Sequence, residues 1–292
     1  MLLPALKDLE NNTGITVVVR EPGISFLRKA GFHCIDMEGG GWHRLFQERP
    51  DPRQRLPVSP QDRVVAYLAD SDGTIRRNLK DYFPGAAIHV FPAYPEAEDE
   101  IHVARYLCET LAGAGLPVDP GCAMERARNR PLLRGGSESG PERGIVVHPG
   151  SGSPRKNLSP ELWLAFLERI SEEPVLQNPG KGVVLLGPAE EGLRDFFGKR
   201  VPRTLETVFC PRDEELVSLL GTARIYAGHD SGVTHLAAML GTPTLALFRQ
   251  DNLSMWRPLG PATRIVHSLK PNEADLEKMV EAARILIRSA YP

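Results

Sequence analysis

Residues 224–248, RIYAGHDSGVTHLAAMLGTPTLALF, decide how this chain folds. The stretch opens with a short apolar run at 225–227 and closes with a second one at 244–248. Between the two runs, apolar side chains recur at the three- and four-residue spacing of one helix face: Val233, Leu236, Ala237 and Leu240. A strand, a helix and a second strand in this order predict a βαβ unit, whose two strands are parallel.

A polar loop, GHDSG at 228–232, precedes the helix of this unit. Asp230 and Ser231 are residue types that cap the start of a helix. The unpaired N–H groups of the first helical turn, together with the helix dipole, favour an anion such as phosphate. His235 follows Ser231 by four residues, so it lies on the same helix face. The loop is either a phosphate site formed by Asp230, Ser231, Gly232 and His235, or a helix cap that binds no ligand.

A second stretch, GIVVHPGSGSPRKNLSPELWLAFLERI at 144–170, repeats this plan. An apolar strand leads into a Gly-Ser loop, and Ser159 then opens a helix. Small residues such as Ser151 and Ser153 let backbone N–H groups approach an anion, and Lys156 adds a positive charge that suits a diphosphate. The motif is neither a Walker P-loop nor a G-x-G-x-x-G fingerprint. A surface loop with solvated charges therefore remains the alternative.

Three segments now stand in a fixed order: HPGSGSPRKN, GHDSGVTHLAAMLGTP and LFRQDNLSMWRPLGP, all between residues 144 and 261. In this order they closely resemble glycosyltransferase family 9, which contains the ADP-heptose:lipopolysaccharide heptosyltransferases. The resemblance implies an α/β fold of the GT-B type, with two Rossmann-like domains whose parallel sheets face each other across a cleft. It further implies that the C-terminal domain holds the nucleotide-sugar donor. The N-terminal half matches more loosely.

The resemblance also implies an activity and a set of donor contacts. The activity is an inverting, metal-independent transfer of a heptose-like sugar from a nucleotide-diphosphate donor, ADP-heptose being favoured, to the lipopolysaccharide core or a related saccharide. The family places a glutamate against the donor ribose, and Glu191 matches it, with Glu190 as the second choice; otherwise the two acids complement a helix dipole. The expected donor-binding residues are Ser151, Ser153, Lys156, Glu191, Asp230, Ser231, Gly232 and His235.

Two other classes of protein stay open at this point. A non-catalytic nucleotide-sugar-binding protein of the same fold would keep both loops. A GT-B nucleotide-sugar epimerase would need acidic residues near the anomeric centre, and we identify none. No cofactor or metal ion is expected, because the chain shows no cluster of acids spaced for Mg²⁺.

Length and composition agree with two globular domains, because 292 residues with 41% hydrophobic and 25% charged residues suit two cores. A net charge of −2 argues against a nucleic-acid partner. No apolar run reaches the roughly 18 residues of a membrane span and no signal peptide opens the chain, so we expect a cytoplasmic protein. It would meet the inner face of the membrane through its acceptor. Four cysteines without C-x-x-C spacing predict reduced thiols: Cys34, Cys108, Cys122 and Cys210.

The predicted organisation has four parts. Residues 1–116 form an N-terminal, acceptor-side Rossmann-like domain, and residues 117–143, rich in Pro, Gly, Ser and charges, form a linker. Residues 144–270 form the nucleotide-sugar-binding domain, and 271–292 form an amphipathic helix. The resemblance implies that such a helix packs back on the first domain, although its own pattern does not decide this. Predicted strands cover 15–19, 34–37, 64–68, 87–91, 144–148, 182–186, 207–210 and 265–268 in addition to those of the opening stretch. Seven basic residues of the first domain are either acceptor contacts or solvated charges: Arg44, Arg49, Arg53, Arg55, Arg76, Arg77 and Lys80.

The first domain departs from a doubly wound sheet in one respect, because it begins with a helix where such a sheet begins with a strand. In the family, that strand leads into a Gly-Asp loop whose aspartate is thought to be the catalytic base, shortly before a Leu-Pro-x-Leu helix. Residues 3–6 match this helix, and Met1 falls just after the aspartate. We therefore expect the chain to lack the base. We also expect a gap or distorted seam in the first sheet beside the 15–19 strand.

Overall fold

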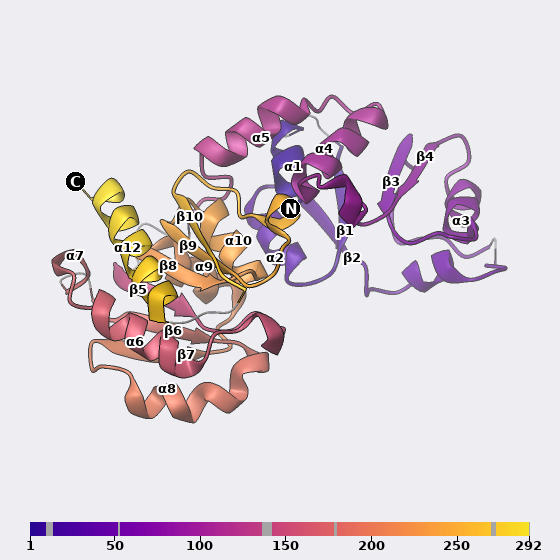
Figure 1. Cartoon of the computed structure of the whole chain (residues 1–292). Coiled ribbons are helices and arrows are strands. Elements are labelled where there is room, and N and C mark those ends of the chain that lie inside the picture. The colour runs from indigo at the N-terminus through magenta and orange to yellow at the C-terminus, as the bar shows by residue number, and fades with distance from the viewer. Residues whose placement is uncertain (10–13, 52, 136–141, 178–179, 270–272, 292) are drawn as a thin grey trace. The chain divides into compact units, whose positions relative to one another are not determined.

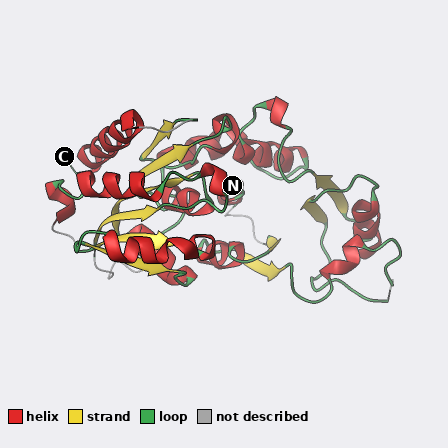
Figure 2. Cartoon of the chain, turned by 60° about the horizontal axis from the view of Figure 1, so that its bottom comes forward, coloured by secondary structure: helices red, strands yellow, loops and turns green. Residues whose placement is uncertain are grey.

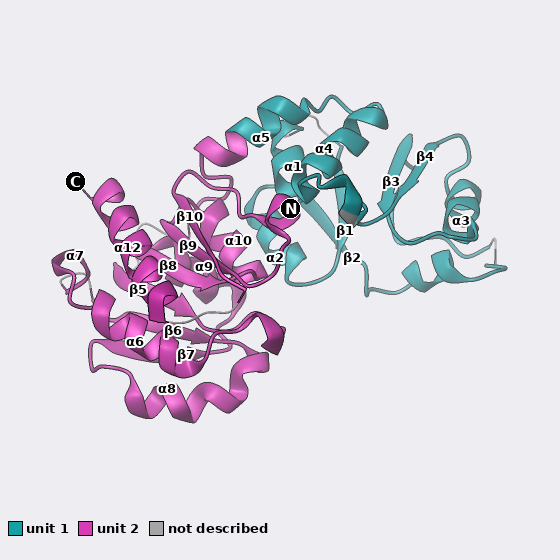
Figure 3. Ribbon diagram, in the orientation of Figure 1, with its two compact units in different colours: residues 1–125 teal, residues 126–292 magenta. Residues whose placement is uncertain are grey.

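The computed structural model describes the chain except for residues 10–13, 52, 136–141, 178–179, 270–272 and 292 (Figure 1). The chain divides into two compact units, Met1–Glu125 and Arg126–Pro292. The boundary falls inside helix α5, Pro120–Asn129, as the change of colour in Figure 3 shows. Strands and helices alternate along both units, which is the α/β class expected from the sequence (Figure 2).

Helix α5 lies in the stretch predicted to be a linker, 117–143, in which no helix was predicted. The Asp119 carboxylate accepts the N–H of Cys122 and caps the helix start. Pro120 and Gly121 resemble helix breakers in the sequence, but proline is well tolerated in a first helical turn, where its missing N–H costs nothing. Ala123, Met124 and Ala127 are buried on one side of the helix. The part of the predicted linker at 136–141 lies outside the described residues.

Unit 2 contains a six-stranded, entirely parallel sheet in the order β10-β9-β8-β5-β6-β7. Its strands are β5 Arg143–His148, β6 Gly182–Leu186, β7 Leu205–Phe209, β8 Ala223–His229, β9 Thr244–Phe248 and β10 Thr263–His267. Strands β5 to β10, numbered one to six, follow the order 3-2-1-4-5-6 of a doubly wound sheet. From β5 the chain adds β6 and β7 on one side and then β8, β9 and β10 on the other. The junction between β5 and β8 is therefore the topological switch point of the sheet. The βαβ unit predicted from residues 224–248 is confirmed as β8, α10 Gly232–Met239 and β9.

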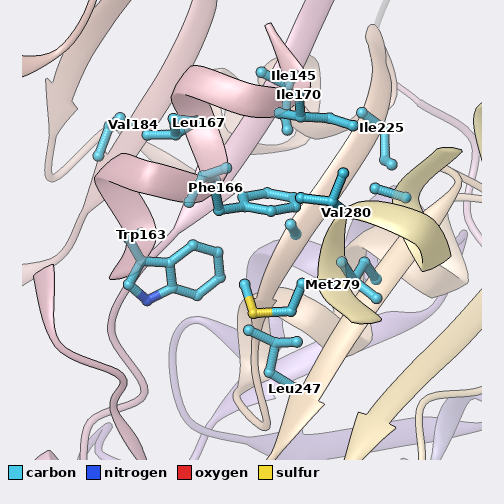
Figure 4. Close-up of a cluster of buried hydrophobic side chains, with 14 of the residues drawn as sticks. Ile145, Trp163, Phe166, Leu167, Ile170, Val184, Ile225, Leu247, Met279 and Val280 are labelled. Atoms are coloured by element: carbon cyan, nitrogen blue, oxygen red, sulfur yellow. The ribbon is translucent and has the colours of Figure 1, made fainter. Parts of the chain in front are cut away.

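Helices cover both faces of this sheet. On one face α6 Pro160–Ile170, α8 Arg194–Arg200 and α12 Glu273–Ala290 share a hydrophobic cluster with alternate residues of the strands, such as Ile145 and Val147. Figure 4 shows Phe166 of α6 directed toward Val280 of α12 in this cluster. Helices α9 Asp213–Gly221 and α10 contact β8 outside that cluster. The apolar face of α12 is therefore buried in the core of unit 2; its predicted packing on the first domain stays a prediction.

Shorter elements complete unit 2. The 3-10 helix η3 Pro154–Lys156 lies in the Gly-Ser loop, and η4 Pro188–Leu193 leads into α8. Helices α7 Pro174–Gln177 and α11 Leu253–Trp256 have four residues each. At this length, a sequence carries too little periodicity to predict a helix.

Unit 1 contains two separate two-stranded parallel sheets. Strand β1 Thr16–Val19 pairs with β2 His33–Asp36, and β3 Arg63–Tyr67 pairs with β4 Ala87–Phe91. Among the described residues, each of these strands has a ladder partner on one side. The predicted interruption beside the 15–19 strand is thus confirmed, while the sheet of unit 2 is continuous.

Side chains connect the two strand pairs, which share no backbone hydrogen-bond ladder among the described residues. The cluster around Trp42, Ile75 and Phe83 receives Val18 from β1 and Val64 from β3. The helices of unit 1 are α1 Leu3–Asp8, α2 Gly23–Lys29, η1 Trp42–Phe46, α3 Thr74–Tyr82, η2 Ala97–Asp99 and α4 Val103–Gly113. All but η1 and η2 follow the sequence pattern.

Helices long and apolar enough to cross a bilayer do not occur among the described residues. All four cysteines are free thiols, as predicted; Cys34 and Cys108 are buried, and Cys122 and Cys210 are exposed.

Candidate functional site

Three loops of unit 2 meet where β5, β8 and β9 end. The loop after β5 carries Ser151, Ser153 and Lys156, the turn after β8 carries Asp230, and the segment at 249–252 follows β9. Because the strands are parallel, their carboxyl ends lie at one edge of the sheet, and the switch point is the usual place for a ligand in such sheets. The fold therefore brings together the two loops that the sequence singled out.

One ion pair joins these two loops. The Lys156 ammonium lies 2.6 Å from Asp230 Oδ2. Burial by itself would raise the pKa of Asp230, but interactions with His235, Lys156 and Asn252 outweigh burial and lower it to about 2. The Asp230 carboxyl group is thus ionised at neutral pH. A carboxylate beside the cation holds the ammonium at the entrance to helix α10.

The start of α10 has the cap that the sequence predicts. Ser231 is the N-cap residue, and its hydroxyl oxygen accepts the N–H of Thr234 at 3.4 Å. The Thr234 hydroxyl lies 3.0 Å from the Tyr226 hydroxyl and also donates to the His229 carbonyl, which fixes the turn from β8 into the helix. Gly232, the first helical residue, is exposed. The first turn thus directs its remaining N–H groups toward the loop edge.

His235 lies on the same side of the helix as Asp230, as its spacing predicts. Its Nε2 atom is 3.8 Å from Asp230 Oδ1, which is an electrostatic contact longer than a hydrogen bond. Burial lowers the pKa of His235, whereas the Asp230 carboxylate opposes that shift. The imidazole is therefore neutral at pH 7. Burial, more than the helix dipole, is the cause.

The two serines of the Gly-Ser loop shape it from within. The Ser151 hydroxyl lies 2.6 Å from Asn157 Oδ1 and 3.0 Å from the Ser153 carbonyl oxygen. That carbonyl also accepts the N–H of Lys156 at 2.9 Å and closes the turn of η3. Lys156 therefore extends from a backbone that Ser151, Ser153 and Asn157 hold in place.

Of the two neighbouring glutamates, the structure places Glu190 against this loop. Glu191 is exposed, whereas the Glu190 side chain is 4% exposed and packs on the backbone of Gly150. A Cβ atom at Gly150 would lie 1.9 Å from Glu190 Oε1, so any larger residue there would displace the Glu190 side chain. The adjacent His148 imidazole lowers the pKa of Glu190, and the N–H groups of Gly187 and Gly152 act in the same direction against burial. A ribose contact remains a prediction for either glutamate.

Two buried histidines behind the loops have no counterpart in the sequence predictions. His229 Nε2 accepts the N–H of Leu158 at 3.0 Å and the indole N–H of Trp163 at 3.2 Å, so its proton is on Nδ1. Burial, with the nearby His148 and the charge of Arg249, lowers the pKa of His229 to about 3. His148 Nε2 lies 3.6 Å from Glu190 Oε2. His229 is therefore neutral at pH 7, and both histidines support the loops from behind.

Arg249 and Asn252 were also not singled out from the sequence. The Arg249 guanidinium donates to the Asn157 carbonyl, and Asn252 Nδ2 donates to Asp230 Oδ2 at 3.2 Å. The sequence feature that could have pointed to them is their position directly after a buried strand, because β9 ends at the same edge of the sheet as β5 and β8.

In unit 1, three of the seven basic residues support the chain itself. Arg44 donates to Gln54 and to the Arg55 carbonyl, Arg76 to the Val90 carbonyl, and Arg77 to the Glu48 carbonyl. The other four are exposed: Arg49, Arg53, Arg55 and Lys80. Groups of three or more His, Cys, Asp or Glu side chains able to hold a metal ion are not found in the described part of the chain.

The site can stabilise a polyanion. It combines a fixed ammonium group, a helix N-terminus and a glycine-rich loop at the switch point of a doubly wound sheet. Such a site binds a diphosphate and can stabilise the charge that develops on a departing diphosphate.

Known structures resemble the whole chain. Glycosyl transferase family 9 from Veillonella parvula DSM 2008 superposes with a TM-score of 0.70 at 15% identity, covering 98% of this chain and 93% of its own. E. coli heptosyltransferase WaaC with ADP gives 0.66 at 16% identity, and E. coli ADP-heptose lps heptosyltransferase II gives 0.66 at 15% identity; each alignment covers 99% of this chain and 95% of the other. The fold is therefore that of the GT-B glycosyltransferases.

The family follows from the sequence match. The model of glycosyltransferase family 9 (heptosyltransferase) matches residues 138–285, about half of the chain, and the protein belongs to this family. It is accordingly a glycosyltransferase. Sequence comparison with curated proteins finds no match.

Proposed function

We propose that the protein is an inverting, metal-independent glycosyltransferase that moves a heptose-like sugar from a nucleotide-diphosphate donor to a saccharide acceptor. The donor we favour is ADP-heptose, and the acceptor we favour is the lipopolysaccharide core. The reaction would take place in the cytoplasm, at the inner face of the membrane if the acceptor is lipid-linked.

The observation that carries this proposal is the Lys156–Asp230 pair at the start of α10. Donor diphosphate oxygens would contact the Lys156 ammonium and the N–H groups of the first helical turn. Ser151, Ser153, Ser231 and Gly232 line the same edge, and His235 and a glutamate of η4 complete the expected set. Lipopolysaccharide biosynthesis agrees with the fold shared with E. coli ADP-heptose lps heptosyltransferase II.

In this mechanism an acceptor hydroxyl attacks the anomeric carbon of the sugar while the bond to the diphosphate breaks on the opposite face. The carbon is thereby inverted, and the electron pair of the broken bond remains on the leaving diphosphate. Lys156 and the helix N–H groups would stabilise that charge without a metal ion. The base that takes the acceptor proton is not assigned.

Two measurements test the proposal. Calorimetric titration with ADP, UDP and GDP should show binding, with ADP preferred. Incubation with ADP-heptose and a core saccharide should release ADP and yield an inverted glycoside, which NMR of the product identifies. A protein that binds none of the three nucleotides would contradict the proposal.

A second function is favoured by one observation, the division of the unit 1 strands into two separate sheets. A catalytically impaired or non-catalytic nucleotide-sugar-binding protein needs the donor site and no intact acceptor side. ADP binding without ADP release from ADP-heptose, across a panel of acceptors, would support this alternative.

A further inference from the structure

The segment at 249–252, which follows the third strand of the site, contacts Asp230 and the loop that carries Lys156. Arg249 contacts the loop that carries Lys156, and Asn252 contacts Asp230. We propose that Arg249 and Asn252 are positioning residues for the donor diphosphate, and that both act through Lys156. This inference rests on the proposed function, because it assigns a diphosphate to the same site.

Arg249 fixes the backbone of Lys156. Its guanidinium donates to the carbonyl of Asn157, the residue that directly follows Lys156. The Asn157 side chain in turn accepts the Ser151 hydroxyl at 2.6 Å. The residue after Lys156 is thus held through both its carbonyl and its side chain, so the Cα atom of Lys156 has little freedom to move.

Asn252 fixes the other end of the Lys156 side chain. Its amide donates at 3.2 Å to Asp230 Oδ2, the same oxygen that lies 2.6 Å from the Lys156 ammonium. A carboxylate held by Asn252 cannot rotate freely, and it therefore holds the ammonium in one place. A lysine side chain loses much rotamer freedom when a ligand fixes it, so holding both of its ends beforehand favours diphosphate binding.

Two buried polar atoms of this segment, Arg249 Nε and Asn252 Oδ1, have no hydrogen-bond partner among the described residues. A buried unsatisfied polar atom destabilises a fold, so stability alone does not account for this segment. Both atoms occur here within four residues, beside the ion pair.

The test compares ADP with AMP, because Lys156 would contact the β-phosphate that AMP lacks. We expect Arg249→Ala and Asn252→Ala each to weaken ADP binding about tenfold in calorimetry, while AMP binding changes by less than about twofold. Arg249→Lys should recover part of the loss. Asn252→Asp should weaken ADP binding more than Asn252→Ala does, because it adds a second negative charge. Matched controls are Arg264→Ala, at an exposed position of β10, and Gln250→Ala, at an exposed position between Arg249 and Asn252; both variants should bind ADP like the wild type.

A double-mutant cycle decides whether the effects pass through Lys156. In a Lys156→Ala background, Arg249→Ala and Asn252→Ala should have almost no further effect on ADP binding. Additive losses, or equal losses for ADP and AMP, would overturn the inference while leaving the proposed function intact. Wild-type protein that binds no ADP would overturn the proposed function itself. If an alanine variant does not fold, Arg249→Met and Asn252→Ser, which remove the same two contacts without adding a charge, take its place in the cycle.

Discussion

Lys156 and Asp230, 74 residues apart in the sequence, form an ion pair with their charged atoms 2.6 Å apart at the start of helix α10. The pair joins the loops that follow β5 and β8, the two strands on either side of the switch point. Its cation is the one positively charged group that the sequence predicted for the donor diphosphate. The energetics of this pair lead to the first two predictions.

Removing the cation should weaken nucleotide-diphosphate binding. Lys156→Ala is expected to reduce the ADP affinity by roughly 1.5 to 3 kcal/mol, the range for a charge-assisted hydrogen bond. Isothermal titration calorimetry gives this number directly. Lys199→Ala is a suitable control, because Lys199 is an exposed lysine of α8 that pairs with Asp195. An unchanged ADP affinity in folded Lys156→Ala protein would remove Lys156 from the site.

The Asp230 carboxylate should make unit 2 less stable in acid. Its pKa falls from about 4 in an unfolded chain to about 2 here. A lowered carboxyl pKa stabilises the folded state above about pH 4, and this stabilisation, roughly 2 kcal/mol, is lost as the pH falls through about 2. Denaturant unfolding at pH 6, 4 and 3 should show wild-type protein losing more stability than Asp230→Asn. Parallel pH profiles for the two proteins would contradict this account.

His235 should remain neutral at pH 7, and its substitution should preserve nucleotide binding. Because burial lowers the pKa of His235 and Asp230 opposes the shift, Asp230→Asn should lower it further. NMR titration of the His235 imidazole in wild type and in Asp230→Asn tests the direction of this pKa change. His235→Gln should retain most of the ADP affinity. A group with a lowered histidine pKa loses folding stability as the pH drops below about 6.5, so wild type should lose more stability in this range than His235→Gln.

Replacing Glu190 or Glu191 of η4 by glutamine should affect stability and ADP binding to different degrees. Glu190→Gln removes a buried charge that lies against Gly150 and His148, and we expect a lower melting temperature and weaker ADP binding. Glu191→Gln alters an exposed side chain and should change the stability by less than about 0.5 kcal/mol. Thermal unfolding and ADP titration of the two variants make the comparison. A larger loss of ADP affinity in Glu191→Gln than in Glu190→Gln would indicate that Glu191 makes the ribose contact.

The local sequence determined most elements of unit 2 and the composition of its two loops. Residues 244–248 and 182–186 are strands with the predicted bounds, and Ser231 and Ser159 are the N-caps that their residue types indicate. These features depend on neighbours within a few positions, where periodicity and capping chemistry act. The interruption of the first sheet also followed from the order of its elements. The helix α5 did not, because its first-turn proline resembles a breaker.

Tertiary structure alone decided which side chains meet. The sequence resemblance favoured Glu191 over Glu190. In the structure, a non-helical backbone at Glu190, with φ −104° and ψ 16°, breaks the regular turn of η4, and Glu190 is the acid buried against the loop. Asn252 meets Asp230, and Arg249 meets Asn157, because the sheet order sets β9 beside β8 and β8 beside β5. Strand order depends on packing between segments far apart in the chain, and the pattern within any one segment carries no information about it.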